Sequence, residues 1–303
     1  MEIQERTCVL IPTLNEIETI EMVIEGFYQN GFANILVIDG GSVDGTQEKA
    51  EEKGAKVIIQ SGGGKGNAVI EAFQMIESEI ILMVDGDGTY LPKDGLDMVK
   101  PLENGKNHTI GDRFHDMGPD AMTLLNRVGN KLINMLFFKI YGENFKDVLS
   151  GYHAFKRDAI EDLFLTSGGF GIEVELGIRC ASENISTEVV PISYRSRTGD
   201  SVAKLNPIRD GIVIVKTLYK LAQTSNPLFY FGSVGLIGLI MGGILGGYAI
   251  FEWLFQSEIH QVVIIGGVFF LLLGAQIMML GLFSETILEL HREKRNAIKK
   301  GWI

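Results

Sequence analysis

Two carboxylates, Asp85 and Asp87, stand one residue apart in the sequence DGDGT at residues 85–89. They directly follow an apolar run at residues 80–84, and a glycine on each side of Asp87 relaxes the turn. Mg²⁺ commonly takes one or two protein carboxylates and leaves room for phosphate oxygens. The spacing therefore predicts a divalent-cation site shared with a pyrophosphate, with an ordinary Asp-Gly turn as the alternative. A calcium loop is excluded, because Tyr90 and Leu96 occupy its required glycine and acidic positions.

A second candidate for ligand binding is the glycine-rich sequence GGGKGN at residues 62–67. A phosphate-binding P-loop requires Ser or Thr after its lysine, where this chain has Gly66. The dinucleotide fingerprint requires glycine where this chain has Asn67. These departures argue against a kinase or a dehydrogenase. Backbone amides and Lys65 at the start of a helix still suit an anion.

Alternating short apolar and amphipathic segments must position these loops. Predicted strands, rich in β-branched residues, are 8–11, 35–38, 57–59 and 80–84. The predicted helices are 16–28, 46–53 and 65–76. Such alternation is typical of an α/β fold with parallel strands and crossover helices. Because ligands bind beyond the carboxyl ends of such strands, we expect the polar loops there to form one site.

Two uncharged apolar stretches, 228–251 and 262–283, mark the C-terminal part of the chain. Each exceeds the ~18–20 apolar residues that cross ~30 Å of hydrocarbon. They predict a two-helix transmembrane hairpin with spans at about residues 228–254 and 262–284.

The domain organisation follows from this hairpin. We expect a catalytic domain over residues 1–205 and an amphipathic interfacial helix or linker over 206–226. A membrane domain would occupy residues 227–303, with a basic cytoplasmic tail at 285–303.

Charges flanking the spans predict the orientation. From Arg292 onward the chain has five Lys or Arg residues and one acidic residue, Glu293, whereas the connection at 256–261 has neither Lys nor Arg. Positive charge prefers the cytoplasmic side. The polar first seven residues do not form a secretory signal. The expected location is the cell membrane, with two spans and with the catalytic domain and both termini in the cytoplasm.

Composition excludes other classes of protein. A net charge of −11 and a pI near 5.0 argue against nucleic-acid binding. Two cysteines, Cys8 and Cys180, predict reduced core residues and no disulfide framework or metal cluster.

The spacing Gly242-x-x-x-Gly246 indicates close helix packing, either within the hairpin or in a homo-oligomer. The apolar segments 122–141 and 206–224 carry a few basic residues, which is typical of interfacial helices or of ordinary core helices.

Four motifs in chain order carry a resemblance to a known family. They are VLIPTLNE at residues 9–16, DGGSVDGT at 39–46, GKGN at 64–67 and DGD at 85–87. The chain resembles the inverting family 2 glycosyltransferases of the A-type (GT-A) fold, and more narrowly the dolichol-phosphate mannose synthases and related polyprenyl-phosphate glycosyltransferases. The resemblance covers about residues 9–205 and implies a Rossmann-like, mostly parallel sheet. The apolar hairpin is similar to that of the membrane-anchored members.

The resemblance implies roles in binding the donor. Pro12, Asn15 and Glu16 would line the nucleoside pocket. Asp39 would bond the base, and Lys65 would lie near the nucleotide. The pair of aspartates at 85 and 87 would hold Mg²⁺ or Mn²⁺ against the diphosphate.

It also implies roles at the acceptor and the sugar. Arg113 and Arg127 would meet the lipid phosphate or the leaving diphosphate, together with Lys131. Asp147 and Ser150 match the family's Asp-x-x-Ser-Gly element beside the sugar, and Ser150 is assigned to the acceptor phosphate.

Arg197 and Gly199, with Ser201 and Lys204, fall where a basic loop of the family closes over the donor. The family has Ser and Lys adjacent, whereas two residues intervene here, so Arg197 is the residue carried over. Structural alternatives remain for several residues. They are pairing of the arginines with Asp112 or Asp116, a capping role for Asp147, and helix-surface positions for Glu173 and Glu175.

The predicted function is transfer of a hexose, with inversion, from a UDP- or GDP-sugar to dolichyl or polyprenyl phosphate at the cytoplasmic membrane face. The product would be a lipid-linked sugar donor for glycan or protein glycosylation. The expected cofactor is Mg²⁺ or Mn²⁺, and the bilayer is an expected partner. One alternative is a family 2 enzyme with another membrane-associated acceptor, although the processive signature Gln-x-x-Arg-Trp is missing. The other is a non-catalytic membrane protein that binds sugar nucleotides, against which the intact pair of aspartates argues.

Overall fold

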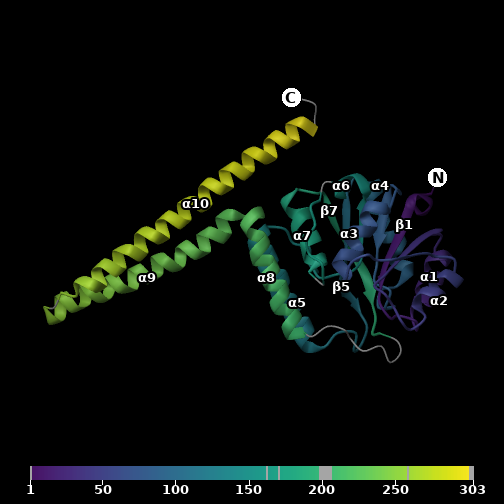
Figure 1. The fold of residues 1–303 in the computed structure, drawn as a ribbon, viewed down its shortest axis with the longest axis horizontal. Coiled ribbons are helices and arrows are strands. Elements are labelled where there is room, and N and C mark those ends of the chain that lie inside the picture. Colours follow the sequence, from purple (N-terminus) through teal and green to yellow (C-terminus); the bar gives the residue numbers. More distant parts are fainter. Residues whose placement is uncertain (1, 162, 170, 198–206, 258, 300–303) are drawn as a thin grey trace. The chain divides into compact units, whose positions relative to one another are not determined.

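The computed structural model describes residues 2–161, 163–169, 171–197, 207–257 and 259–299. The chain divides into two compact units between Leu218 and Tyr219. The first unit is built around a β-sheet with helices, and the second consists mainly of two long helices (Figure 1).

The first unit contains a seven-stranded sheet in the order β3-β2-β1-β4-β6-β5-β7. Its strands are β1 (Thr7–Thr13), β2 (Asn34–Asp39), β3 (Lys56–Ile59), β4 (Ile80–Met83), β5 (His108–Met117), β6 (His153–Lys156) and β7 (Thr187–Tyr194). Strands β3, β2, β1 and β4 are parallel to one another. Strand β6 is antiparallel to both neighbours, and β5 is parallel to β7. The expected α/β fold with a mostly parallel sheet is confirmed.

Helices connect most of these strands. They are α1 (Ile20–Gln29), α2 (Thr46–Glu52), α3 (Lys65–Met75), α4 (Gly95–Glu103), α5 (Leu124–Tyr141), α6 (Arg157–Ile160) and α7 (Ile172–Ser182), with short 3-10 helices at Ile3–Arg6 and Pro92–Asp94. The helix expected from residue 16 begins later, at Ile20. Asn15 has a left-handed φ of 51°, and the N–H of Glu16 donates to Thr46 Oγ1 at 2.9 Å, so this segment forms a turn first.

Apolar packing on the sheet forms the core. Strand β1 is buried over all seven residues, as expected for a central strand covered on both faces. Val9 and Ile11 of β1 share a core cluster with Ile24 and Phe27 of α1. The two cysteines are buried and free, which confirms their prediction as reduced core residues.

Helix α8 (Pro207–Ser225) contains the boundary between the two units. The expected interfacial helix or linker over residues 206–226 stays a prediction, and its described part is helical up to Ser225. Helix α5 has features of both structures predicted for its sequence, an interfacial helix and an ordinary core helix. Ile133 and Phe137 are buried, whereas Leu125, Leu132 and Phe138 are exposed apolar side chains.

The second unit pairs α9 (Pro227–Gln256) with α10 (Gln261–Lys299), which lie side by side along much of α9 (Figure 1). Both helices are long and apolar enough to cross a membrane. A Cβ added at Gly242 would lie 2.8 Å from the Gly267 carbonyl oxygen, and one at Gly274 would lie 2.6 Å from that of Gly235. These glycines therefore pack the hairpin itself. Helix α10 continues to Lys299, so residues 285–299 of the expected basic tail are helical.

Candidate active site

Loops at the carboxyl ends of β1, β2 and β4 meet residues from α3, α7 and the segment after β7. The chain folds this way because parallel strands direct their carboxyl ends to one edge of the sheet. Asp85 and Asp87 follow β4, whereas Arg197 follows β7 and is 110 residues distant from Asp87 in the sequence. Their contacts define the site.

Asp85 forms an ion pair with Lys65, the first residue of α3. The Nζ atom of Lys65 also lies 2.5 Å from an oxygen of Glu173 in α7, which is buried. Burial alone would lower the pKa of Lys65, but the charges of Asp85 and Glu173 outweigh it and raise that pKa. Burial raises the pKa of Asp85, with Lys65 opposing it and with Asp87 and Glu173 adding to it. Lys65 therefore stays charged between two carboxylates.

Asp87 is held from both sides. One oxygen accepts hydrogen bonds from the backbone and side chain of Thr89, at 3.1 and 2.7 Å. The other oxygen lies 2.6 Å from Nη2 of Arg197. Nη1 of Arg197 is 4.0 Å from Glu16, so this arginine links the turn after β1 to the turn after β4.

The site has an excess of negative charge. Glu16 and Glu173 join the two aspartates, so four carboxylates face two cations, Lys65 and Arg197. Two neighbouring carboxylates in such surroundings fit a divalent cation. Within the described ranges, no three His, Cys, Asp or Glu side chains form a group that could hold a metal ion. A cation at this pair therefore needs further ligands from a substrate or water.

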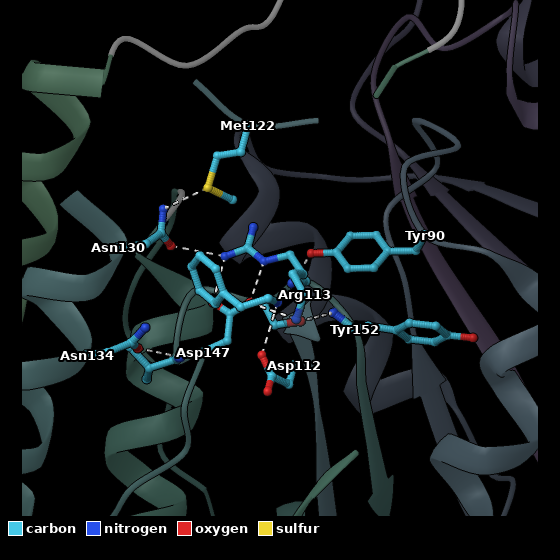
Figure 2. A network of polar contacts seen from close by, with 12 residues as sticks. Tyr90, Asp112, Arg113, Met122, Asn130, Asn134, Asp147 and Tyr152 are labelled. Atoms are coloured by element: carbon cyan, nitrogen blue, oxygen red, sulfur yellow. Dashed lines mark hydrogen bonds and ion pairs between the residues drawn. The ribbon is translucent and has the colours of Figure 1, made fainter. Parts of the chain in front are cut away.

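Another ion pair, between Arg113 and Asp147, joins β5 to the turn before β6 (Figure 2). Nε of Arg113 donates to one oxygen of Asp147 at 2.6 Å, and Nη2 donates to the other at 2.8 Å. Nη2 also donates to Asn130 of α5 at 3.1 Å, and the guanidinium lies 5.4 Å from the ring centre of Tyr194. Both partners are buried, and the charge of Asp147 raises the pKa of Arg113 although burial opposes it. Bidentate pairing of this kind fixes the orientation of the guanidinium.

This geometry corrects two structural alternatives for the arginines and Asp147. Arg113 pairs with Asp147 and not with Asp112, whose carboxylate accepts from the Phe114 N–H at 3.0 Å. Asp116 pairs with Arg195 at 2.7 Å. Asp147 does not act as a helix cap, because both its oxygens hold the arginine side chain.

The Asp-x-x-Ser-Gly turn lies against the acidic pair. The hydroxyl of Ser150 is buried and accepts from the Tyr152 N–H at 3.3 Å, so its side chain organises the turn. The N–H of Gly151 donates to the Tyr90 hydroxyl at 2.6 Å. A Cβ added at Gly151 would lie 2.4 Å from an oxygen of Asp85, so this position requires glycine.

The expected nucleoside-pocket residues lie in and after β1 and β2. Pro12 is buried within β1, and the Asn15 Oδ1 accepts from the Val43 N–H at 3.0 Å. Asp39 is fully buried, and its two oxygens accept hydrogen bonds from neighbouring backbone and side-chain groups. These bonds lower the pKa of Asp39 although burial opposes them. Asp39 therefore shapes this loop in the structure.

The sequence patterns did not predict that the glycine-rich loop packs against residues 167–168. Cβ atoms added at Gly66 and Gly64 would lie 1.8 and 2.4 Å from the carbonyl oxygens of Ser167 and Gly168, respectively. The buried carboxylate of Glu175 accepts from the N–H of Ser167 at 2.6 Å and from the N–H of the preceding residue at 3.0 Å. The glycines thus allow close backbone contact with residues 167–168. The helix-surface interpretation of Glu173 and Glu175 is wrong, because both are buried and bonded.

The other basic residues predicted for the acceptor are exposed to solvent. Arg127 and Lys131 are exposed on α5, the helix that supplies Asn130 to Arg113. Nη2 of Arg127 lies 3.3 Å from Met117 Sδ. The expected loop residues Gly199, Ser201 and Lys204 lie outside the described residues.

Comparison with known proteins finds a family model and several similar sequences that match this chain. Residues 8–164 match the model of glycosyl transferase family 2. The chain is 50% identical over 301 residues to Glycosyltransferase AglJ of Haloferax volcanii, covering 99% of both proteins. It is 34% identical over 218 residues to the Dolichyl-phosphate hexose transferase of the same organism, covering 70% of this chain and 92% of that protein.

A solved structure of glucosyl-3-phosphoglycerate synthase from Mycobacterium tuberculosis is similar in fold. Its TM-score is 0.57 at 20% identity, covering 72% of this chain and 78% of that chain. The likeness agrees with the α/β sheet. The chain belongs to glycosyl transferase family 2 and has the GT-A fold, followed by two long apolar helices.

Proposed function

We propose that this glycosyltransferase moves a hexosyl group from a UDP- or GDP-sugar to the phosphate of dolichyl or polyprenyl phosphate. The observation that carries the proposal is a largely buried acidic cluster, with two cations facing four carboxylates, in a chain that also has two membrane-length helices. Support also comes from relatives named Dolichyl-phosphate hexose transferase and, at 27% identity, Dolichol-phosphate mannosyltransferase of Pyrococcus furiosus. A lipid acceptor explains why an otherwise water-facing enzyme has such helices.

Asp85 and Asp87 would hold Mg²⁺ or Mn²⁺. A structural neighbour is described in complex with Mn²⁺ and uridine-diphosphate-glucose, which supports this choice of ion and donor. When bound, such an ion neutralises charge on the donor diphosphate. Lys65 and Arg197 contact the same two carboxylates and would therefore lie beside the diphosphate.

The acceptor needs little activation in this reaction. A phosphate monoester has a second pKa near 6, so it is mostly a dianion at neutral pH. One of its oxygens would attack the anomeric carbon from the face opposite the diphosphate. The bond from that carbon to the diphosphate oxygen breaks, the nucleoside diphosphate leaves with the electron pair, and the configuration inverts.

Basic residues would bring the two anions together. Arg113 is held rigidly by Asp147, and among the described residues its Nη1 has no hydrogen-bond partner, which leaves a donor for a phosphate oxygen. Arg127 and Lys131 would add positive charge for the lipid phosphate from the exposed side of α5. A preorganised cation costs no reorientation at the moment of reaction.

The donor's nucleoside would lie at the ends of β1 and β2. Pro12, Asn15, Glu16 and Asp39 line this region, and hydrogen bonds between the two loops fix its shape. In the bilayer, α9 and α10 would span with both ends in the cytoplasm, because the basic residues lie after the second span. The sugar nucleotide and the lipid phosphate would meet at that face.

The test uses purified full-length protein in lipid nanodiscs with polyprenyl phosphate, Mn²⁺ and a panel of UDP- and GDP-sugars. Mass spectrometry of the lipid extract should detect one hexosyl-phosphate-lipid. Appearance of glycosylated water-soluble acceptors without any glycolipid would favour another acceptor. Tight binding of a nucleotide sugar without any product from any acceptor would favour the non-catalytic alternative.

A further inference from the structure

Two buried histidines lie together on neighbouring strands, His108 at the start of β5 and His153 at the start of β6. Both side chains are fully buried. Nε2 of His108 lies 2.9 Å from Nδ1 of His153, and the rings are nearly parallel. Phe155 stacks on His108 with ring centres 4.5 Å apart. Neither histidine belongs to the acidic cluster or to the arginine pair.

A hydrogen-bond chain fixes where the protons lie. Nε2 of His153 is 2.8 Å from the carbonyl oxygen of Ser150, which can only accept, so this nitrogen carries a hydrogen. In a neutral ring Nδ1 then accepts, so Nε2 of His108 donates to it. This leaves Nδ1 of His108 as an acceptor, 3.0 Å from the Thr187 hydroxyl oxygen. That oxygen also lies 3.0 Å from the Ile185 carbonyl oxygen, and because the hydroxyl has one hydrogen, this arrangement requires it to donate to Nδ1 and not to the carbonyl.

The last acceptor in this series of hydrogen bonds, the Ser150 carbonyl oxygen, belongs to the 147–151 turn beside the active site. Ser150 lies between Asp147, which orients Arg113, and Gly151, which abuts Asp85. The turn therefore touches both the arginine and the acidic pair. A shift of the Ser150 carbonyl would move both contacts.

We propose that His153, fixed by His108 behind it, is a positioning residue that holds the 147–151 turn in its active geometry through the Ser150 carbonyl. The effect on turnover rests on the proposed function, whereas the arrangement of protons does not. Each ring acts as one link, because a neutral imidazole offers one donor and one acceptor on opposite sides.

Electrostatics support a neutral pair. Burial lowers the pKa of His108 well below its ordinary value, and the repulsion that a second charged ring at His153 would exert adds to this. Burial lowers the pKa of His153 to about 3, aided by Lys65 and Arg113 and opposed by the bond to Ser150. At neutral pH both rings therefore keep the single-proton form that the chain of hydrogen bonds requires.

The first experiment reads the protons directly. Full-length protein labelled with ¹⁵N in its five histidines is reconstituted in lipid, and imidazole nitrogens are observed by solid-state NMR at pH 7. His108 and His153, assigned by single substitution, should both be neutral with the hydrogen on Nε2. A charged ring, or a hydrogen on Nδ1 of either neutral ring, would overturn the proposal. This readout stands even if no hexosyl transfer is found.

The second experiment compares variants that keep or remove the donor to Ser150. In His153→Gln the amide nitrogen replaces Nε2, so kcat should stay within about threefold of wild type. In His153→Leu the donor is lost, and kcat should fall about tenfold to a hundredfold, because misplacing a positioned group by ~1 Å costs up to that much. The KM for the nucleotide sugar should change much less than kcat.

The matched control is His115→Leu, the same change at an exposed histidine of the neighbouring strand β5, which should leave both constants unchanged. Equal losses in the Gln and Leu variants would refute positioning by the donor. If His153→Leu fails to fold, the Gln variant and the NMR spectra still decide. If wild type transfers no hexose to any acceptor, the proposed function fails, and the NMR result alone decides the proton arrangement.

Discussion

Asp147 binds the side chain of Arg113 through both carboxylate oxygens, at 2.6 and 2.8 Å, and also accepts from its backbone N–H at 3.2 Å. The two residues are 34 positions apart, on β5 and in the turn before β6. One buried aspartate thus fixes the position of an entire arginine. This makes the aspartate as important for the site as the arginine that it holds.

Replacing Asp147 with Asn should therefore impair both folding and turnover. Breaking a buried pair leaves a charge without its partner and costs about 3–5 kcal/mol. We expect a clear drop in melting temperature and a loss of hexosyl transfer of at least about tenfold, measured on the full-length protein. Asp116→Asn, which removes an exposed aspartate paired with Arg195, is the control and should change neither quantity much. Similar effects of the two substitutions would contradict the special role of Asp147.

Removing Asp87 should abolish transfer. Asp87→Ala deletes one of the two carboxylates proposed to hold the cation and leaves Arg197 without its 2.6 Å partner. We expect initial rates to fall by about 100-fold or more, and we expect EDTA to stop the wild-type enzyme until Mn²⁺ is restored. Asp97→Ala, at an exposed residue of α4, is the control. Wild-type rates in Asp87→Ala would rule out the cation-binding role.

Gly66→Ala tests the contact between the glycine-rich loop and residues 167–168. Helix propensity alone favours alanine over glycine by about 1 kcal/mol. The new Cβ would nevertheless lie 1.8 Å from the Ser167 carbonyl oxygen, so we expect a lower melting temperature and reduced turnover. Gly63→Ala in the same loop meets nothing within 4 Å and should be neutral. A stabilised Gly66→Ala variant would show that the two segments do not touch.

The buried histidines predict a dependence of stability on pH. Since folding lowers the pKa of His153 from about 6.5 to about 3, the unfolded chain binds more protons below pH 6.5. His153 therefore does not reduce the free energy of unfolding above pH 6.5. Below that pH the free energy of unfolding decreases, by about 2 kcal/mol at pH 5, because protons bind to this imidazole more readily in the unfolded chain.

Urea unfolding of the catalytic unit within the full-length protein, followed by pulse proteolysis, measures this contribution. Wild type should lose stability relative to His153→Gln between pH 7 and pH 5, because the carboxylates titrate in both proteins alike. Parallel stability curves for the two proteins would contradict the pKa shift.

The sequence alone is sufficient for the fold class, and it predicts which polar loops gather at one edge of the sheet. Apolar runs with β-branched residues predicted β1 to β4, and the polar loops after them do converge. The two uncharged stretches predicted α9 and α10 directly, because hydrocarbon-length helices require a continuous apolar composition. These signals are local, so each can be read from a short segment.

Tertiary structure decided which charged groups meet. The partners Arg113 with Asp147, Lys65 with Glu173, and Arg197 with Asp87 lie far apart in the chain, and no local pattern pairs them. The same holds for His108 and His153, whose contact depends on β5 and β6 lying side by side in a defined register. Periodicity records which face of a strand is buried, whereas the identity of the neighbour depends on the order of strands in the sheet. That order exists only in the folded chain.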